Sequence, residues 1–540
     1  MGKLIAGILA VALLALGAPA LAQTPLPRFE QGEVRPVLLV DGQPFIALAV
    51  QANNSSGYPA VLTQVWPRAR RLGANTVMLP VAWEQVEPVE GTFDFSAVDA
   101  MLAGARENDL RLVLLWYGTW KNTGLSYTPA WVKRDGLRFP RMRHPDGVAH
   151  NTLSPHGGAT MAADARAFAA LMRHLARHDP QHTVIMMQVE NEAGSWRLPR
   201  DHSPAADALF AGPIPQELAT ALDVPRRTWL EAFGPRAEQF FNSWYVARYI
   251  DHVARAGQAE LALPMIVNAA LGDAFTDEGG EVGPSGGPNW NAFPIWRAAA
   301  PSLAGLGPDI YNRDAAQVER FLDRYAANGP LLVTEIGNAA EYARFAWPSF
   351  GRGALIFSPF GMDDTGYVNY PLGAKVLDEA TLDAFAAPYR LLGSAMSGWP
   401  RIAADHPLWG TARGTDGADQ STVMGRWRLT AAYGRWAFGE DDWTWIATDP
   451  HPLADVPTGG LLVAQLDADT FLVGGQHARL RLSLADPTPG ESAQVIEAQE
   501  GTFVNGEWVM RRRWNGDQID YGFSFGAEPV WLRIVMDSYR

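Results

Sequence analysis

The sequence contains no cysteine, so no disulfide bond stabilises the fold and a lipid anchor on a cysteine is excluded. Only 19% of the 540 residues are charged, and the formal net charge is −14. This acidic balance argues against a nucleic-acid partner and suits a protein that handles neutral ligands. A chain of this length exceeds one ordinary domain, and its stability must come from its core.

Long apolar runs are missing except near the N-terminus. The apolar residues 4–16 follow Lys3 and precede the small residues of segment 20–22, which is the pattern of a secretory signal peptide (residues 1–22). This run is too short to span a bilayer, and no later segment reaches the ~18 apolar residues that a span requires. We therefore expect export to the periplasm or the medium, no membrane insertion, and either a monomer or a homodimer.

Several motifs of enzyme chemistry are also missing. No Gly-x-Gly-x-x-Gly follows the first predicted strand, and no phosphate-binding loop is found, so the sequence gives no support for nucleotide chemistry. A Gly-x-Ser-x-Gly elbow is also missing, so the sequence gives no support for a serine hydrolase. The histidines between positions 144 and 182 lack the close pairing of a zinc protease, and we interpret them as surface or loop residues. We predict neither a metal nor a cofactor.

What the sequence does contain is a regular alternation of short apolar segments and helical segments. Strands are predicted at 45–50, 74–83, 110–117, 184–190, 264–269, 308–311, 331–335 and 353–357, and helices at 60–72, 96–108, 161–178, 237–256 and 315–328. Eight such units predict an α/β protein with a closed (β/α)8 barrel over residues 23–400, the open doubly wound sheet being the alternative. Residues 401–540 change to short alternating strands with Asn-Gly turns, which predicts an antiparallel β-sandwich-like domain. That domain either binds glycan or packs against the barrel.

Two predicted strands end abruptly in acidic residues. Val184–Val189 leads into Glu190-Asn191-Glu192, and Leu331–Thr334 leads into Glu335. Strand alternation predicts Glu190 and Glu192 on one face, and barrel active sites lie at the C-terminal ends of strands. The alternative is that each glutamate caps a helix or pairs with an arginine, but buried carboxylates are costly unless they are paired or used.

A carboxylate pair on two barrel strands fits glycoside hydrolysis, in which one group is the acid and base and the other is the nucleophile or base. Retention of configuration requires a separation of ~5 to 5.5 Å, whereas inversion requires a wider gap for water. The sequence alone leaves these two outcomes open.

Several motifs together resemble glycoside hydrolase family 35, the retaining β-galactosidases, in its bacterial branch with a distinctive C-terminal domain. They are Asn75 with the run to Trp83, Glu87-Pro88, Gly91–Phe95, Leu114–Asn122, Gln188-Val-Glu-Asn-Glu-Ala-Gly194 and Thr334-Glu335. The resemblance implies that Glu192 is the acid/base and Glu335 the nucleophile. It further implies that Asn191 binds the sugar hydroxyl beside the reacting carbon, that Glu190 supports Glu192 or the ring hydroxyls, and that Tyr311 donates a hydrogen bond to Glu335.

The sequence departs from the family pattern after the second and third strands. Trp83–Pro88 replaces the usual Trp-Asn-x-His-Glu-Pro, and Gly118–Lys121 replaces a glutamate-tryptophan pair. Those positions normally help to hold galactose, so alternative sugar contacts are expected from Glu84, Trp120, Lys121 and Asn122. Trp83 and Trp120 could equally stack on sugar or pack in the core, and Asn268 lies at the end of its own strand in the same ring.

The resemblance implies an exported exo-β-galactosidase that removes terminal galactose from oligosaccharides or polysaccharide side chains, with xyloglucan as one candidate. The nearest alternative is a β-glycosidase of the same fold that acts on a glucoside, xyloside or arabinoside. A non-catalytic glycan-binding protein is the alternative of another class, because a fold alone does not establish catalysis.

Overall fold

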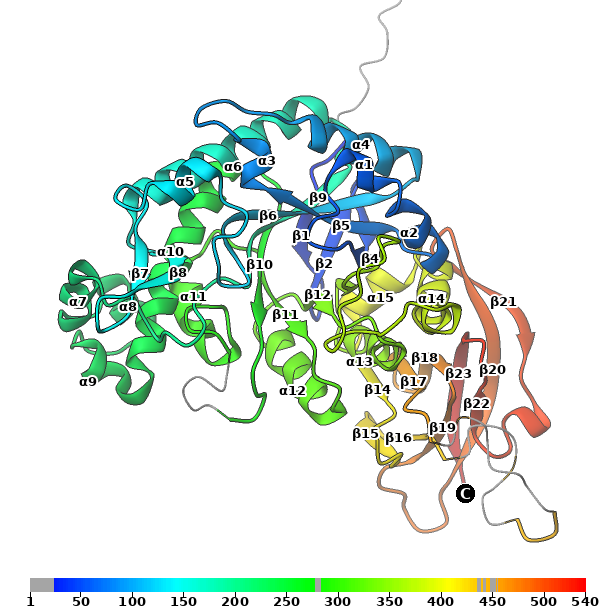
Figure 1. Cartoon of the computed structure of the whole chain (residues 1–540). Helices are drawn as coiled ribbons and strands as arrows, with labels where there is room; N and C mark the ends of the chain where they lie inside the picture. The colour runs from blue at the N-terminus through cyan, green and yellow to red at the C-terminus, as the bar shows by residue number, and fades with distance from the viewer. Residues whose placement is uncertain (1–23, 277–282, 435–438, 440–442, 447–452, 454) are drawn as a thin grey trace, which may run out of the picture.

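The computed structural model describes residues 24–276, 283–434, 439, 443–446, 453 and 455–540. Its centre is a closed barrel of eight parallel strands, as predicted (Figure 1). In chain order the strands are β4 (Ala47–Gln51), β5 (Thr76–Ala82), β6 (Arg111–Lys121), β9 (Val184–Asn191), β10 (Met265–Ala270), β11 (Gly305–Ile310), β12 (Leu332–Ile336) and β13 (Ile356–Pro359). The expected signal peptide lies outside the described residues.

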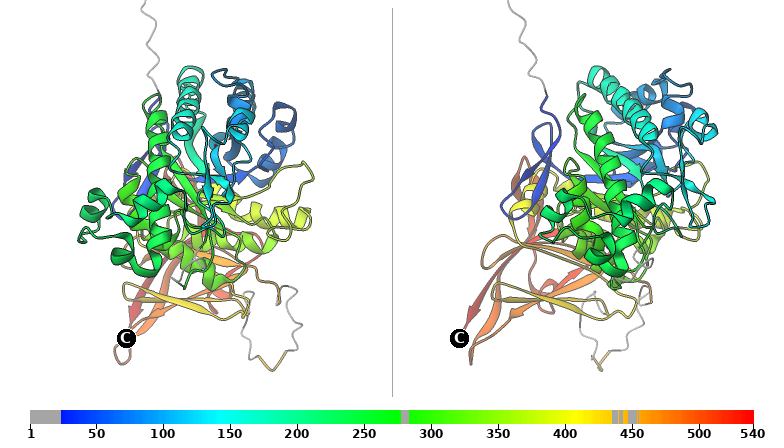
Figure 2. Two further views of the ribbon diagram at one scale, coloured as in Figure 1. Left: turned by 60° about the vertical axis from the view of Figure 1, so that its left-hand side comes forward. Right: turned by 90° about the vertical axis from the view of Figure 1, so that its left-hand side faces the viewer.

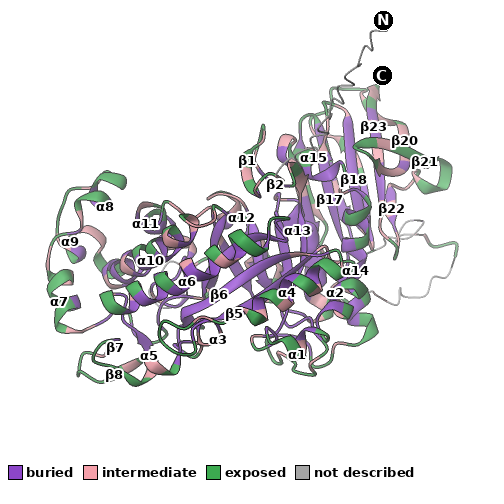
Figure 3. Ribbon diagram, turned by 90° about the horizontal axis from the view of Figure 1, so that it is seen from above, coloured by how far each residue is buried: buried purple, intermediate pink, exposed green. Residues whose placement is uncertain are grey.

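The barrel strands are apolar because both of their faces are covered, the inner face by side chains of other strands and the outer face by helices. Every residue of β5, β9, β10, β12 and β13 is buried. Figure 3 shows the barrel strands β5 and β6 as buried and the surrounding helices as exposed on their outer sides. The period of the sequence pattern therefore predicted the fold correctly.

The surrounding helices vary in length. They are α1 (Pro59–Leu62), α2 (Trp66–Leu72), α3 (Trp83–Val86), α4 (Ser96–Glu107), α5 (Ala130–Arg134), α6 (Gly158–His178), α7 (Pro204–Ala211), α8 (Gln216–Ala221), α9 (Trp229–Phe233), α10 (Ala237–Gln258), α11 (Phe293–Ala299), α12 (Ala315–Ala326), α13 (Ala346–Phe350), α14 (Glu379–Ser394) and α15 (Trp399–Asp405). Aspartates begin two of them, since Asp314 accepts from the Gln317 amide and Asp378 from the Thr381 amide. The helix predicted at 60–72 is broken into α1 and α2. No helix in the described ranges has the length and apolar character that crossing a membrane demands.

A small antiparallel sheet of β1 (Arg28–Gln31), β2 (Pro36–Val40) and β3 (Gln43–Phe45) precedes the barrel. An Asp-Gly turn joins β2 to β3, with φ of 53° at Asp41 and 75° at Gly42. Positive φ at both central residues matches the twist of a two-residue hairpin. A further two-stranded sheet, β7 (Arg141–Arg143) with β8 (Ala149–Leu153), lies in the long connection after β6.

The C-terminal part forms two antiparallel sheets, as predicted (Figure 2). The six-stranded sheet has the order β14 (Leu408–Ala412), β17 (Gly460–Gln465), β18 (Thr470–Gln476), β23 (Val530–Tyr539), β20 (Ser492–Val504) and β21 (Glu507–Arg513). The four-stranded sheet consists of β15 (Gln420–Met424), β16 (Trp427–Ala432), β19 (Ala478–Leu484) and β22 (Phe523–Phe525).

Strands β17 and β18 of the six-stranded sheet are buried on both sides and join the two parts of the chain. On β17, Leu461 and Val463 belong to the core between the two sheets, whereas Leu462 and Ala464 belong to the core of the barrel. Trp399 and Trp531 also meet across this boundary, with ring centroids 5.0 Å apart. The C-terminal sheets therefore pack against the barrel through a continuous apolar contact.

Candidate active site

A cavity of about 530 Å³ opens at the C-terminal ends of the barrel strands. Strand ends contribute Lys121, Glu192, Asp309, Tyr311 and Glu335 to its lining, and loops contribute Asn54, Asn122, Trp196, Tyr367 and Asn369 among others. This is the position at which barrels of this type present their functional side chains. The structure thus brings both predicted catalytic glutamates into one cavity.

Glu335 is buried at the end of β12 and is held from two sides. Gln51, the last residue of β4, donates from Nε2 to Glu335 Oε2 over 2.8 Å. The phenol of Tyr311 donates to Glu335 Oε1, as the resemblance implied. Both donors fix the carboxylate in one orientation.

Glu192 follows directly after β9, and its backbone N–H donates to Asn268 Oδ1 over 2.8 Å. Its carboxylate and those of Glu335 and Asp309 each offer an oxygen within 4.8 Å of the others. Burial raises the pKa of Glu192 to about 7, while Lys121 lowers it and the charge of Glu335 raises it. A carboxyl group with this pKa can hold a proton near neutrality and release it to a leaving group.

Asp309 is a third carboxyl group of the cavity that the sequence interpretation did not single out. Its Oδ2 accepts from Asn268 Nδ2 over 2.6 Å, and its Oδ1 accepts from Thr334 Oγ1 over 3.2 Å. Burial first, and then the charges of Glu335 and Glu192, raise its pKa well above the usual range. Burial and the neighbouring charges therefore favour the protonated form of Asp309 beside the two catalytic candidates.

Two of the three candidate asparagines, Asn191 and Asn268, are buried next to the carboxyl groups. Asn268 Nδ2 donates to Asn191 Oδ1 over 3.1 Å, and Gln188 Nε2 donates to the same oxygen over 3.2 Å. Asn191 Nδ2 in turn donates to Asn122 Oδ1 over 3.3 Å. This chain of amides connects β9 to β10 and to the end of β6, and it orients the Asn191 amide.

The end of β6 bulges outward before it reaches the cavity. Pairing with β9 is interrupted between Trp116 and Lys121, and Lys121 then pairs with Asn191. Within the bulge the Thr119 and Trp120 amides donate to the two carboxylate oxygens of Glu190 over 3.0 and 2.6 Å. The bulge delivers Lys121 and the adjacent Asn122 into the cavity lining.

Glu190 therefore does not lie beside Glu192, and the expectation that both point to one side is wrong. Its carboxyl group is buried against Asp164 of α6, and this burial and the Asp164 charge raise the pKa of Glu190 well above its usual value. Burial likewise raises the pKa of Asp164, which accepts from Trp116 Nε1 over 2.8 Å and from Thr119 Oγ1 over 2.7 Å. Burial and the proximity of the two acids therefore favour a proton on this Glu190–Asp164 pair, which lies outside the cavity lining.

Three further candidates lie away from the cavity, which corrects the expectation that they contact sugar. Trp83 is fully buried and donates from Nε1 to Glu87 Oε2 over 2.9 Å. Trp120 is also fully buried, and its ring centroid lies 4.7 Å from that of Tyr249. Both tryptophans thus belong to the core, the alternative that the sequence left open. Glu84 forms an ion pair with Lys133 at 3.0 Å and is not part of the cavity lining.

The backbone around the cavity is strained at several non-glycine residues. Positive φ angles occur at Asn122 (49°), Thr123 (61°), Glu190 (65°), Glu192 (47°) and Arg197 (58°). Such conformations are uncommon outside glycine, cost of order 1 kcal/mol or more each, and concentrate at functional sites. Because two of them fall at Glu190 and Glu192, normal strand alternation ends there.

Two groups of described residues have a spacing compatible with metal binding. Asp99, His174 and His178 form one group on the outer helices, and Glu192, Asp309 and Glu335 form the other. In the second group the pKa of Asp309 is raised by burial and by the neighbouring charges, and Glu335 already accepts two hydrogen bonds. That set of donors is better suited to proton transfer than to holding a cation.

Comparison with known proteins gives two family matches. Residues 60–249 match a family model described as beta-galactosidase, that of glycoside hydrolase family 42, and residues 385–526 match a domain of unknown function (DUF5597). The predicted similarity to β-galactosidases is therefore confirmed. Family 35 itself is not confirmed, because the matching model is that of family 42.

The chain is also similar to individual proteins. A curated beta-galactosidase of Xanthomonas manihotis is 31% identical over 204 residues, which is 36% of this chain and 31% of that protein, so the chain matches about a third of that relative's length. Among solved structures, the cold-adapted β-galactosidase of Rahnella sp. R3 has a TM-score of 0.48 at 16% identity and covers 68% of this chain and 58% of its own. The β-galactosidase of Bacillus circulans sp. alkalophilus has a TM-score of 0.48 at 12% identity, with coverages of 66% and 60%.

Proposed function

We propose that the protein is an exported, retaining exo-β-galactosidase that releases terminal β-galactose from oligosaccharides or polysaccharide side chains, xyloglucan among them, without a cofactor. The observation that carries this proposal is the carboxylate pair of Glu192 and Glu335, with oxygens within 4.8 Å of each other in one cavity. This spacing resembles that of retaining enzymes (~5 to 5.5 Å) and is narrower than the gap that inversion needs.

In the proposed reaction Glu335 attacks the anomeric carbon while Glu192 gives its proton to the departing glycosidic oxygen. The bond from the anomeric carbon to that oxygen breaks, and a covalent galactosyl ester of Glu335 forms. Glu192, now ionised, takes a proton from water as the water attacks the same carbon, and free β-galactose leaves. The pKa of Glu192 near 7 fits both halves of this cycle.

The finer assignment to family 35 is part of the proposal and is supported by the Gln188–Gly194 motif. Export is supported by the N-terminal pattern of residues 1–22. The similarity of residues 60–249 to β-galactosidases supports galactose as the sugar. The matched relative is a beta-galactosidase, which also supports galactose as the sugar, although that match covers only part of either chain.

A second candidate is a β-glycosidase of the same mechanism that acts on another sugar. It is favoured by the presence of Lys121 and Asn122 in the cavity, where the family pattern has a glutamate-tryptophan pair. A panel of aryl β-glycosides separates the two candidates, because the sugar that is cleaved fastest identifies the pocket's specificity.

The first experiment is hydrolysis of that panel with NMR of the first-formed anomer. Release of β-galactose supports both the sugar and retention, whereas first-formed α-galactose contradicts retention. Glu335→Ala should abolish turnover, and added azide should restore it as a galactosyl azide of inverted configuration. Full activity of this variant would refute the nucleophile assignment, and failure to cleave any glycoside would favour the non-catalytic glycan-binding protein.

A further inference from the structure

A second cavity of about 460 Å³ lies beside the catalytic one, and Trp196 lines both. Trp196 stands four residues after Glu192 on the loop that leaves β9. Its side chain is 44% exposed, which is unusual in a chain whose large tryptophans are mostly buried. An exposed indole shared by two adjoining cavities needs an explanation other than core packing.

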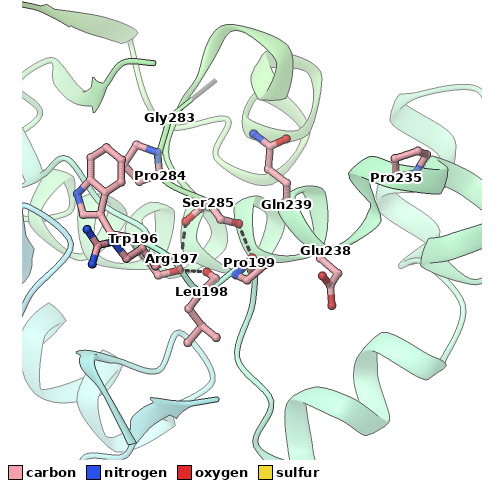
Figure 4. A pocket seen from close by; sticks show the side chains of 11 residues that line it. Trp196, Arg197, Leu198, Pro199, Pro235, Glu238, Gln239, Gly283, Pro284 and Ser285 are labelled. Atoms are coloured by element: carbon pink, nitrogen blue, oxygen red, sulfur yellow. Dashed lines mark hydrogen bonds between the residues drawn. The ribbon is translucent and has the colours of Figure 1, made fainter. Parts of the chain in front are cut away.

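The composition of the second cavity resembles that of a sugar site. Its wall contains the flat or apolar side chains of Trp196, Leu198 and Pro284 together with the polar groups of Arg197 and Gln239. Figure 4 shows Trp196 and Arg197 together at one end of the cavity, and Glu238 and Gln239 of α10 on the other side. A pyranose ring presents C–H groups on its faces and hydroxyl groups on its edge, so it matches an apolar platform with a polar rim.

The platform is held rigidly from several directions. Ser195 and Ser285 form a short antiparallel bridge, with N–H to O distances of 2.8 and 3.1 Å. Asn242 of α10 donates from Nδ2 to the Ser285 carbonyl over 2.9 Å, and a ring nitrogen of His150 lies 3.1 Å from the Trp196 carbonyl. The backbone that carries the indole is therefore already fixed before a ligand binds, which lowers the part of the entropic cost of binding that comes from ordering this loop.

We infer that the second cavity is a subsite for the leaving-group side of the substrate, in which the indole of Trp196 stacks against a pyranose ring of an oligosaccharide. This inference rests on the proposed function, because Glu192 is there the group that protonates the leaving oxygen. The leaving group must depart past Glu192, and the loop that begins at Glu192 leads directly to Trp196. The enzyme is thereby adapted to a glycosyl leaving group longer than one sugar.

The test compares a compact substrate with longer ones. 4-Nitrophenyl β-galactoside, lactose, and the β-galactosides of cellobiose and cellotriose are hydrolysed by the full-length wild type and by Trp196→Ala. A galactosylated xyloglucan oligosaccharide is included in the same series. We expect kcat/KM to rise as the leaving group lengthens, and Trp196→Ala to lower it roughly tenfold more for the longest substrate than for the nitrophenyl one.

Trp445→Ala is the matched control, because Trp445 is 73% exposed in the C-terminal part of the chain and lines neither cavity. Trp445→Ala should leave kcat/KM unchanged for both the nitrophenyl substrate and the longest substrate. If Trp196→Ala lowers the rates on all substrates equally, or on none, the subsite is refuted. A selective loss on the nitrophenyl substrate alone would also overturn it and would point to an aromatic leaving group.

Binding without turnover separates this inference from the proposed function. Saturation-transfer NMR with cellobiose, cellotriose and a degalactosylated xyloglucan oligosaccharide should give signals in the wild type that are lost in Trp196→Ala. If no β-galactoside is hydrolysed but this binding is found, the galactosidase assignment fails and the sugar subsite stands. If none of these oligosaccharides binds through Trp196, the subsite is refuted even if the galactosidase activity is confirmed.

Discussion

The charge of Lys121 offers a direct test of how the acid/base is tuned. Lys121 lowers the pKa of Glu192 against the effects of burial and of Glu335, and the balance leaves this pKa at about 7. Glu192 must carry its proton to assist the leaving group, so kcat/KM of the wild type should fall as the pH rises through about 7. Removing the positive charge in Lys121→Met raises the pKa of Glu192 and moves this decline to higher pH.

The size of the shift follows from Coulomb's law. For illustration, two unit charges separated by ~8 Å interact with about 0.5 kcal/mol at the dielectric constant of water and with about 2 kcal/mol at an effective value of ~20. These limits correspond to roughly 0.4 and 1.5 pH units, and we expect about one unit for a cavity that is open to solvent. Because Lys121 lines the cavity, its replacement can also change the maximal value of kcat/KM. The pH at which kcat/KM declines is therefore the diagnostic quantity.

The assay is the pH profile of kcat/KM for a substrate with a poor leaving group. Lys133→Met is the matched control, because it makes the same charge change at a lysine that pairs with Glu84 and lies outside the cavity lining. The control should leave the decline near pH 7. A decline that stays in place in Lys121→Met, or that moves to lower pH, would refute the assignment of this pKa to Glu192.

Three further substitutions probe other parts of the structure. Asp309→Asn should keep kcat/KM at pH 6 within about tenfold of the wild type, because the raised pKa of Asp309 favours its protonated form and an amide resembles that form, whereas a loss of ~1,000-fold would mean that Asp309 works as an anion or a proton donor. Asp164→Ala should lower the free energy of unfolding by about 3 kcal/mol in urea titration, since buried donors lose their acceptor, and an unchanged midpoint would contradict this. Gly410→Ala would place a Cβ 2.3 Å from the Trp347 carbonyl oxygen and should lower Tm, whereas Gly136→Ala, which meets nothing within 4 Å, should not.

The barrel could be predicted from the sequence because parallel strands buried on both faces leave an unmistakable apolar pattern between helices. The same pattern predicted three residues of the cavity, because a polar residue that ends a buried apolar strand lies at the C-terminal end of the barrel. These residues are Glu192, Glu335 and Tyr311. Asp309 carried a signal that was not used. It lies two residues before Tyr311 on β11, and strand alternation places both side chains on the same face.

The errors arose where the backbone leaves regular strand geometry. Alternation predicted Glu190 and Glu192 on one side, but positive φ angles at both residues turn their side chains apart. Trp83 and Trp120 lie at strand ends, as expected, yet a helix turn at the first and a bulge at the second direct them into the core. Sequence periodicity carries no information about a bulge, so these orientations could not be predicted.

The segment Gly118–Lys121, which differs from the family 35 pattern, is connected through the structure to Glu190 and to the cavity. A Cβ on Gly118 would lie 2.4 Å from Trp116 Nε1 and 2.7 Å from Glu190 Oε1, so glycine leaves the space that the buried Glu190 carboxyl group occupies. Glu190 in turn binds the amides that define the bulge, and the bulge brings Lys121 into the cavity. Because Lys121 lowers the pKa of Glu192, an acidic pair outside the barrel indirectly sets the proton affinity of the proposed catalytic acid.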